Sequence, residues 1–328
     1  MIVTWLVFDE LTQTASGYYS PIASLRYRLA IPLRSLEDMG HRVRVVQVHP
    51  DADPATVASR LGGDALIVAK VNYPAGDAFR KLSALVMKLV EAAQRDGRRV
   101  IVDVCDDLFS VPVYGEFLRA LVVRADSVVA SSAQMAEVVH ARTSRGSWIA
   151  EDPFEGPRGI ARFEPPGPRP RGLLGRLLGP VLPGQARARA LKLLWFGHGS
   201  NFAAAVEFIP QLERLVGRYS LGLHFITSIE SGAPKLCASF NERHAPLCEL
   251  RFTPWSLAAM QHGLADCDLV IIPTRLSDTT KLVKSSNRLV QSLWSGRFVL
   301  AHPISSYRKF EAYSTPPGLI SWIMPTVW

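Results

Sequence analysis

Apolar residues in the first half of the chain follow two alternating patterns. Short, continuous apolar runs predict buried strands, and these runs fall at 2–8, 42–48, 65–69, 100–104, 127–130 and 148–150. Between them, apolar residues three and four positions apart predict amphipathic helices, which fall at 23–39, 78–95, 114–123 and 133–141. Buried strands alternating with amphipathic helices are typical of a parallel sheet covered on both faces. We therefore expect residues 1–155 to form one doubly wound α/β domain, with its ligands at the carboxyl ends of the strands.

The same alternation returns at Leu191 and predicts a second α/β domain over residues 191–328. Strands are expected at 191–196, 221–227, 247–252, 268–272 and 298–301, and helices at 202–216, 257–264, 289–294 and 305–313.

The connection between the two domains, residues 156–190, has a different composition. Its prolines preclude regular structure, and residues 157–190 carry seven arginines against one acidic residue. The segment 172–180 is short, basic and apolar, so it can lie on an anionic membrane surface. The interpretation that we favour is an interdomain linker with an apolar patch.

Composition bounds the class of protein and its location. The chain has 328 residues, of which 48% are hydrophobic and 20% charged, as in a well-packed globular protein. No apolar run approaches the roughly 18 residues that a membrane-spanning helix needs, and the start MIVTWLVFDE is typical of a strand rather than a signal peptide. Four cysteines without a CxxC pair are typical of reduced thiols. We therefore expect a cytoplasmic protein, with peripheral contact at the inner face of the membrane as an open alternative.

The net charge of +8 indicates an anionic partner. The sequence contains no zinc-finger, RRM or KH pattern, so nucleic acid is the least favoured anion. A nucleotide sugar, a lipid diphosphate or an anionic membrane fits the charge equally well.

The stretch KLVKSSNRLVQSLWSGRFVLAHP, residues 281–303, combines a basic, hydroxyl-rich helix start with a buried strand. Backbone N–H groups at a helix start have no partner within the helix, and the helix dipole favours an anion there. Lys284, Ser285, Ser286 and Asn287 add side-chain donors at this point. Gln291, about one turn further along, can reach a sugar or ribose hydroxyl.

This stretch resembles the donor-site helix of the GT-B glycosyltransferases, especially the retaining group 1, family 4-like enzymes that use nucleotide sugars. The matching residues are Gln291 to Leu300, QSLWSGRFVL, where the family reads roughly E-A-M-A-x-G-x-P-V-V. Gln291 replaces the glutamate that holds the donor ribose, Phe298 replaces the usual proline, and Val283 stands where the family has a second glutamate. The strand with the family pattern "aD-hh-hhPs" is Cys267 to Thr274, CDLVIIPT.

The resemblance implies two Rossmann-like αβα domains that face each other across a cleft. The second domain then binds the donor: the turn Gly197, His198, Gly199, Ser200 and Asn201 positions the diphosphate and sugar, and Trp255 stacks on the base. Lys284, Arg275 and the helix start at Ser285 and Ser286 stabilise the leaving diphosphate.

The resemblance also implies the reaction and its co-substrates. It implies a metal-independent hexosyl transfer in surface polysaccharide or glycolipid synthesis, with a nucleotide-diphosphate sugar as co-substrate and no other cofactor. The acceptor is then a saccharide or a lipid-linked molecule.

Two groups of residues in the first domain are candidates for binding the acceptor. Arg26 and Arg28 lie in an S-x-R-x-R sequence after the first long loop, where they can meet a phosphate or form an exposed basic helix start. Asp106 and Asp107, with Asp103, lie at the end of a predicted strand, where carboxylates can bind acceptor hydroxyls or, as the less favoured alternative, a divalent metal. Asp106 or Asp107 is the candidate base if the reaction inverts the anomeric carbon, and a helix-capping role is the alternative for at least one of them.

Two other functions remain open at this level. The missing glutamates, together with the apparent absence of the family's final crossing helix, favour a GT-B-shaped binding or scaffold protein without catalysis. A sugar-nucleotide epimerase of the same fold is the third possibility, and it would need no acceptor.

Overall fold

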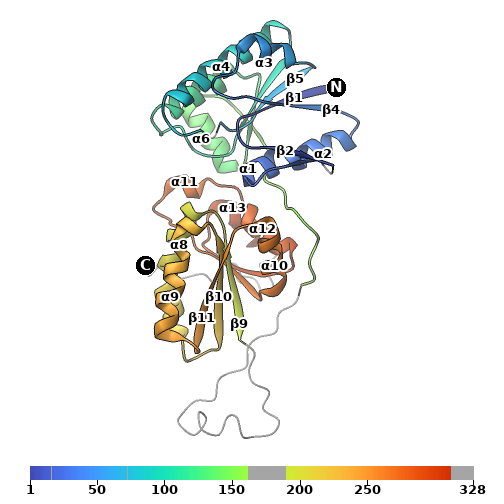
Figure 1. The fold of residues 1–328 in the computed structure, drawn as a ribbon. Coiled ribbons are helices and arrows are strands. Elements are labelled where there is room, and N and C mark those ends of the chain that lie inside the picture. The colour runs from blue at the N-terminus through green and yellow to red at the C-terminus, as the bar shows by residue number, and fades with distance from the viewer. Residues whose placement is uncertain (16, 72, 162–189, 312–328) are drawn as a thin grey trace, which may run out of the picture. The chain divides into compact units, whose positions relative to one another are not determined.

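The structure is a computed structural model that describes residues 1–15, 17–71, 73–161 and 190–311 (Figure 1). The chain forms two compact units. The first unit contains Met1–Pro153 and Asp278–Asn287, and the second contains Phe154–Ser277 and the chain from Arg288 onward.

The sheet of the first unit has six parallel strands in the order β4-β1-β5-β6-β7-β8. The strands are β1 (Ile2–Val7), β4 (Arg42–Gln47), β5 (Ala65–Val68), β6 (Arg99–Val104), β7 (Ser127–Ala130) and β8 (Trp148–Ile149). All six strands predicted for this half are therefore confirmed to within a residue or two at their ends.

Alternate side chains of β1 enter two different cores. Val3, Trp5 and Val7 pack in one cluster with Leu25 and Leu29, from the first long helix. Leu6 belongs to the other cluster, which contains side chains from α3 (Pro54–Arg60), α4 (Asp77–Arg95), α5 (Tyr114–Arg124) and α6 (Ala133–Thr143). Successive side chains of a strand point to opposite faces of its sheet, so both faces are covered, as a doubly wound sheet requires.

The first long helix contains a π-helical segment that the spacing of apolar residues did not predict. The expected helix at 23–39 is α1 (Ala23–Leu25), the π-helical segment η1 (Arg26–Ala30) and α2 (Ile31–Asp38) in succession. Such segments insert a residue into the helix and often occur at functional positions. Arg26 and Arg28 both lie within η1, and both are buried.

Three short elements between β1 and β5 were not predicted. The antiparallel pair β2 (Thr12–Thr14) and β3 (Gly17–Tyr19) and the helix α3 bury few apolar side chains, and Val57 is the buried residue of α3. The start of α3 is instead fixed by Asp53, whose carboxylate accepts hydrogen bonds from the Thr56 N–H and hydroxyl.

The second unit has five parallel strands in the order β11-β10-β9-β12-β13. They are β9 (Leu191–Phe196), β10 (Leu221–Thr227), β11 (Cys248–Pro254), β12 (Leu269–Ile272) and β13 (Phe298–Ala301). The helices that accompany them are α8 (Phe202–Leu215), α9 (Ala233–His244), α10 (Leu257–Asp266), α12 (Asn287–Trp294) and α13 (Ser305–Arg308). All five predicted strands are confirmed, and α9 is an addition.

The chain crosses between the units at different positions from those expected. Residues 278–287, which include the short helix α11 (Thr279–Leu282), group with the first unit although the sequence placed them in the second domain. Residues 154–161, which the sequence divided between the first domain and the linker, group with the second unit. The candidate membrane segment 172–180 and the chain beyond 311 lie outside the described residues. Among the described residues, no helix is both long and apolar enough to cross a membrane.

Residues 154–161 pack against α12 through aromatic contacts and hydrogen bonds. The ring of Phe154 stacks on Trp294 with 3.9 Å between centroids, and the indole N–H of Trp294 donates to the Gly156 carbonyl at 3.0 Å. The Gly159 N–H donates to the Trp294 carbonyl at 2.9 Å.

Gly159→Ala is expected to lower the free energy of unfolding by about 1–2 kcal/mol, the usual range for an added methyl group in a tight contact. A Cβ atom on Gly159 would lie 2.1 Å from the Ser295 carbonyl oxygen, so the backbone of one segment must move away from the other. Urea unfolding measures the change. Gly146→Ala is the matched control, because a Cβ atom there meets nothing within 4 Å. Equal stabilities of the two variants would contradict the prediction.

Candidate functional sites at the carboxyl ends of the two sheets

The carboxylate of Asp106 lies between two lysines at the carboxyl end of the first sheet. Lys70 follows β5, and its Nζ atom is 2.6 Å from Asp106 Oδ2. Lys284 comes from the segment 278–287, and its Nζ atom is 2.8 Å from Asp106 Oδ1. Burial alone would raise the pKa of Asp106, but the charges of Lys284 and Lys70 outweigh it and lower the pKa to about 2. Asp106 is therefore ionised throughout the neutral range.

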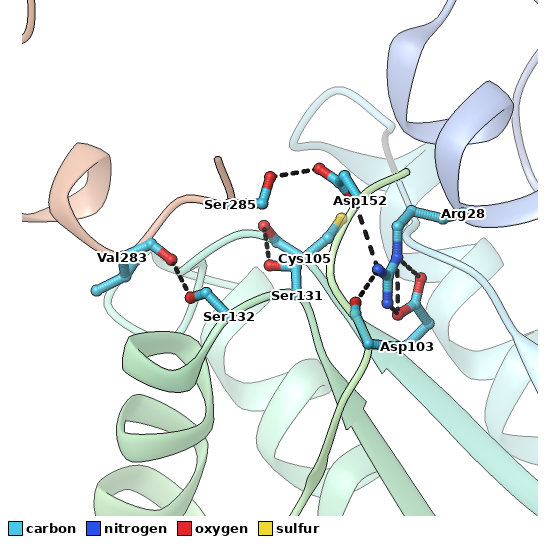
Figure 2. A network of polar contacts seen from close by, with 9 residues as sticks. Arg28, Asp103, Cys105, Ser131, Ser132, Asp152, Val283 and Ser285 are labelled. Atoms are coloured by element: carbon cyan, nitrogen blue, oxygen red, sulfur yellow. Dashed lines mark hydrogen bonds and ion pairs between the residues drawn. The ribbon is translucent and has the colours of Figure 1, made fainter. Parts of the chain in front are cut away.

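A second charged network lies beside this one, around Arg28 (Figure 2). The Arg28 guanidinium makes a bidentate ion pair with Asp103, the penultimate residue of β6, and its Nε atom is 2.9 Å from Asp103 Oδ2. It also donates to the Ala150 carbonyl and lies 3.4 Å from Asp152. Burial lowers the pKa of Arg28, but the hydrogen bond and charge of Asp103 more than reverse this and raise it. Arg28 is therefore permanently charged and fully engaged with protein groups.

The segment 283–285 is attached to the first unit by two hydroxyl groups. The Ser132 hydroxyl donates to the Val283 carbonyl at 2.6 Å, and the Ser285 hydroxyl donates to Asp152, as Figure 2 shows. Burial raises the pKa of Asp152, and the bond from Ser285 offsets only part of this effect. The side chain of Val283 packs against the apolar core. Position 283, which holds a glutamate in the resembled family, is therefore occupied here by an apolar side chain that contacts the core.

The other residues predicted for this half are also placed. Arg26 donates to the carbonyls of Ser20 and Pro21, at 3.1 and 2.8 Å. Asp107 accepts a hydrogen bond from the Phe109 N–H at 3.2 Å, a local turn contact. It caps no helix, because the next helix, α5, begins only at Tyr114. Beside Lys70 and Asp106 lies a pocket whose lining includes Tyr114, Phe117 and Leu118.

In the second unit, the glycine-containing turn directly follows β9, as predicted. Gly199–Asn201 form one 3₁₀ turn that leads into α8. The exposed His198 accepts a hydrogen bond from the Ser200 N–H through Nδ1, at 3.2 Å. A Cβ atom on Gly199 would lie 2.4 Å from the Ser228 hydroxyl oxygen, so glycine permits close approach to the turn that follows β10.

Buried polar atoms collect along the same edge of this sheet. Four of them have no hydrogen-bond partner among the described residues. These atoms are Nε1 of Trp195 near the end of β9, Oγ1 of Thr227 at the end of β10, Oγ1 of Thr274 after β12 and Oγ of Ser306 after β13. An unsatisfied buried polar group costs about 1–3 kcal/mol, so this concentration along one edge is typical of a site that takes a polar ligand.

Three other predicted donor residues, Arg275, Gln291 and Trp255, have protein partners. Arg275 is exposed and its Nε atom is 2.6 Å from Glu207. The side-chain amide of Gln291 is buried and makes two hydrogen bonds, both of 2.8 Å, with the N–H and carbonyl of Glu155. Trp255 is half-buried, and its backbone N–H donates to the Thr227 carbonyl at 2.8 Å.

The predicted donor cluster is divided between the two units. Lys284, Ser285, Ser286 and Asn287 belong to the first unit, whereas Gln291 and Arg275 belong to the second. Sequence reasoning also missed Lys70 and Asp152, and it included Asp103 only as a member of the carboxylate cluster at the end of its strand. Lys70 and Asp152 each follow a predicted strand by one or two residues, and that position was the available signal.

Comparison with solved structures identifies the architecture. The structure of HepE from Anabaena with UDP has a TM-score of 0.58 at 15% identity, covering 94% of this chain and 83% of HepE. A glycosyltransferase from Rickettsia africae has a TM-score of 0.56 at 10% identity, covering 93% of this chain and 80% of that one. The chain has the GT-B fold. An alpha-glucosyltransferase in complex with UDP and a mismatched 13-mer DNA follows at a TM-score of 0.54 and 11% identity, covering 92% of this chain and 78% of that one.

These similarities concern the fold. No protein-family model matches the chain, and no curated protein matches its sequence. The function therefore has to be argued from the sites themselves.

Proposed function

We propose that this protein transfers a sugar from a nucleoside diphosphate sugar to a hydroxyl acceptor. The second unit binds the donor at the carboxyl edge of its sheet, and the first unit binds the acceptor. The observation that carries the proposal is the row of buried polar atoms that have no partner among the described residues, along the sheet edge that carries the turn Gly197–Asn201. Structures of the same fold hold UDP or UDP-glucose.

Binding of the donor uses groups that the second unit presents at this edge. The backbone of the turn Gly197–Asn201 approaches the diphosphate, since a βα turn before a helix favours an anion. His198 is exposed and lies at the start of the turn, where it can contact the diphosphate or the sugar. Trp255 follows β11 directly and provides a face on which a base can stack.

The acceptor site is the pocket beside Lys70 and Asp106. Tyr114, Phe117 and Leu118 line its walls, and aromatic and apolar walls of this kind suit the faces of a sugar ring or a lipid tail. Asp106 accepts a hydrogen bond from the acceptor hydroxyl and orients it.

A carboxylate whose pKa is about 2 is a weak base at neutral pH. We therefore propose the retaining course, in which the bond from the anomeric carbon to the diphosphate oxygen breaks and the acceptor oxygen bonds to the same face. The hydroxyl proton passes to the leaving phosphate oxygen, so no protein base is needed.

The resemblance to the retaining enzymes supports two further parts of the proposal. The transferred group is a hexosyl group, moved without a metal, and the acceptor belongs to surface polysaccharide or glycolipid synthesis. The reaction takes place in the cytoplasm, at the inner face of the membrane when the acceptor is lipid-linked.

The test is release of nucleoside diphosphate from a panel of nucleotide sugars, with and without saccharide and lipid-linked acceptors. Release that requires an acceptor supports the transferase. Conversion of the nucleotide sugar without an acceptor indicates an epimerase instead and contradicts the proposal.

A second candidate function is binding of the donor without transfer. Two positions favour it: Val283 packs into the core of the first unit, and the Gln291 amide is engaged by Glu155. These are the positions of the paired glutamates in the resembled family. Binding of a nucleoside diphosphate, with no release from any nucleotide sugar, would identify this function.

A further inference from the structure

Arg288 is a cation of the second unit that sequence reasoning passed over. It lies in the first turn of α12, and its half-buried guanidinium hydrogen-bonds the hydroxyl of Tyr307. Tyr307 is 3% exposed and lies on α13. A buried phenol fixed by its own helix therefore limits the rotation of the guanidinium.

The guanidinium faces the turn that begins at Gly197. A Cβ atom on Gly197 would lie 3.5 Å from Arg288 Nη1 and 3.6 Å from a ring carbon of Trp195. The absence of a side chain at Gly197 thus leaves the guanidinium against the backbone of the turn, at the end of β9.

Two buried hydroxyl groups lie at the same edge of the sheet. Ser306 precedes Tyr307, and its Oγ atom is buried without a partner among the described residues, as is Oγ1 of Thr274. These hydroxyls can donate to the oxygens of an anion, and an arginine can bind a phosphate through two parallel N–H groups.

The two cations that the sequence favoured are engaged elsewhere. Arg275 forms an ion pair with Glu207 at the surface, and Lys284 belongs to the first unit, where it pairs with Asp106. Arg288, by contrast, lies against the turn at Gly197, which is predicted to bind the phosphates.

We infer that Arg288, held in place by Tyr307, binds the diphosphate of the donor at the turn Gly197–Asn201. The inference rests on the proposed donor site and adds the residue that carries the positive charge there. Arg288 contacts the diphosphate and stabilises the charge that grows on it as the sugar leaves. Tyr307 is a positioning residue that acts through Arg288.

The experiment compares the affinities of nucleoside diphosphates and of the matching nucleosides by calorimetry. Arg288→Gln is expected to weaken binding of the diphosphate about tenfold, the effect of losing one charge-assisted contact. Binding of the nucleoside, which has no phosphate, is expected to stay unchanged. Tyr307→Phe is expected to weaken diphosphate binding about threefold by the same measure. If either residue served stability alone, its substitution would change the affinities for the diphosphate and the nucleoside to the same extent.

Two further variants complete the experiment. Arg288→Lys keeps the charge but loses the two-pronged geometry, so its affinity for the diphosphate should lie between those of the wild type and Arg288→Gln. It also serves if Arg288→Gln does not fold. Arg214→Ala removes an exposed arginine of α8 in the same unit and is the matched control, with wild-type affinity expected.

The outcomes separate this inference from the proposed function. If the wild type binds a diphosphate and both Arg288 variants bind it with the same affinity, the role of Arg288 is overturned but the donor site is supported. Absence of wild-type binding to every diphosphate overturns the donor site, and the role of Arg288 with it.

Discussion

Asp103→Asn is expected to lower the free energy of unfolding by about 3 kcal/mol, the cost of removing one partner from a buried ion pair. Asp103 is 7% exposed and makes the bidentate contact with Arg28, which is 8% exposed. An asparagine at this position turns an NH₂ group toward a guanidinium that can only donate, and it leaves a buried positive charge with weaker compensation. Urea unfolding at neutral pH measures the change.

Asp152→Asn is the matched variant, and it should change the free energy of unfolding by less than about 1 kcal/mol, because a neutral amide avoids the cost of burying a charge. Burial is the largest influence on the pKa of Asp152 and raises it. The contribution of a carboxyl with a raised pKa is fully present below its ordinary pKa, and it is lost as the pH rises through the raised value. Asp152→Asn should therefore also remove part of the loss of stability on going from acid to neutral pH. Equal effects of the two substitutions would show that Arg28 does not depend on Asp103 in particular.

Asp106→Asn is expected to remove about 2 kcal/mol of stability at neutral pH, given a pKa lowered from 3.8 to about 2. A carboxyl with a lowered pKa contributes stability above its ordinary pKa, and this contribution is lost as the pH falls through the lowered one. The wild type should therefore lose stability between pH values of roughly 4 and 2, and the variant should lose less over the same range. Unfolding by urea at a series of acidic pH values measures both curves.

The two lysines provide the control for this prediction. Lys70→Gln and Lys284→Gln each remove one of the charges that lower the pKa of Asp106, so each should reduce the same pH dependence in part. The account of Asp106 is contradicted if Asp106→Asn and the wild type lose stability in parallel over this range.

Most strands of the two sheets were predictable because their sequences are rich in buried apolar residues. β9 and β10 match the expected ranges because apolar residues predominate in each and a glycine or a serine follows each. The elements that were missed are held by other forces. α3 buries Val57 and depends on the cap at Asp53, and β2 pairs with β3 through backbone hydrogen bonds. The spacing of apolar residues carries no information about a helix cap or about backbone pairing between short strands.

The candidate site was predictable in its position but not in its partners. Asp106 and the turn at Gly197 lie just after the carboxyl ends of strands, where the sequence placed them, because parallel strands end at one edge. Their roles stay predictions. The pairing of Asp106 with Lys284 joins residues far apart in sequence, and it requires that the segment 278–287 pack with the first unit.

The burial of Arg28 has a similar origin. It depends on the π-helical segment η1, which rotates the side chain toward Asp103 and Asp152. A pattern of apolar residues at three- and four-residue spacing contains no information about that rotation.

Hydrogen exchange of the backbone amides, with and without a saturating nucleoside diphosphate, tests the central claim most directly. Binding of the diphosphate at the carboxyl edge of the second sheet should slow exchange in the peptides that contain Gly197–Asn201 and the start of α12, because the ligand shields these segments and disfavours their local opening. The matching nucleoside should protect these peptides less. The donor site is contradicted if every diphosphate of the panel leaves exchange in these peptides unchanged, or if protection appears in the first unit alone.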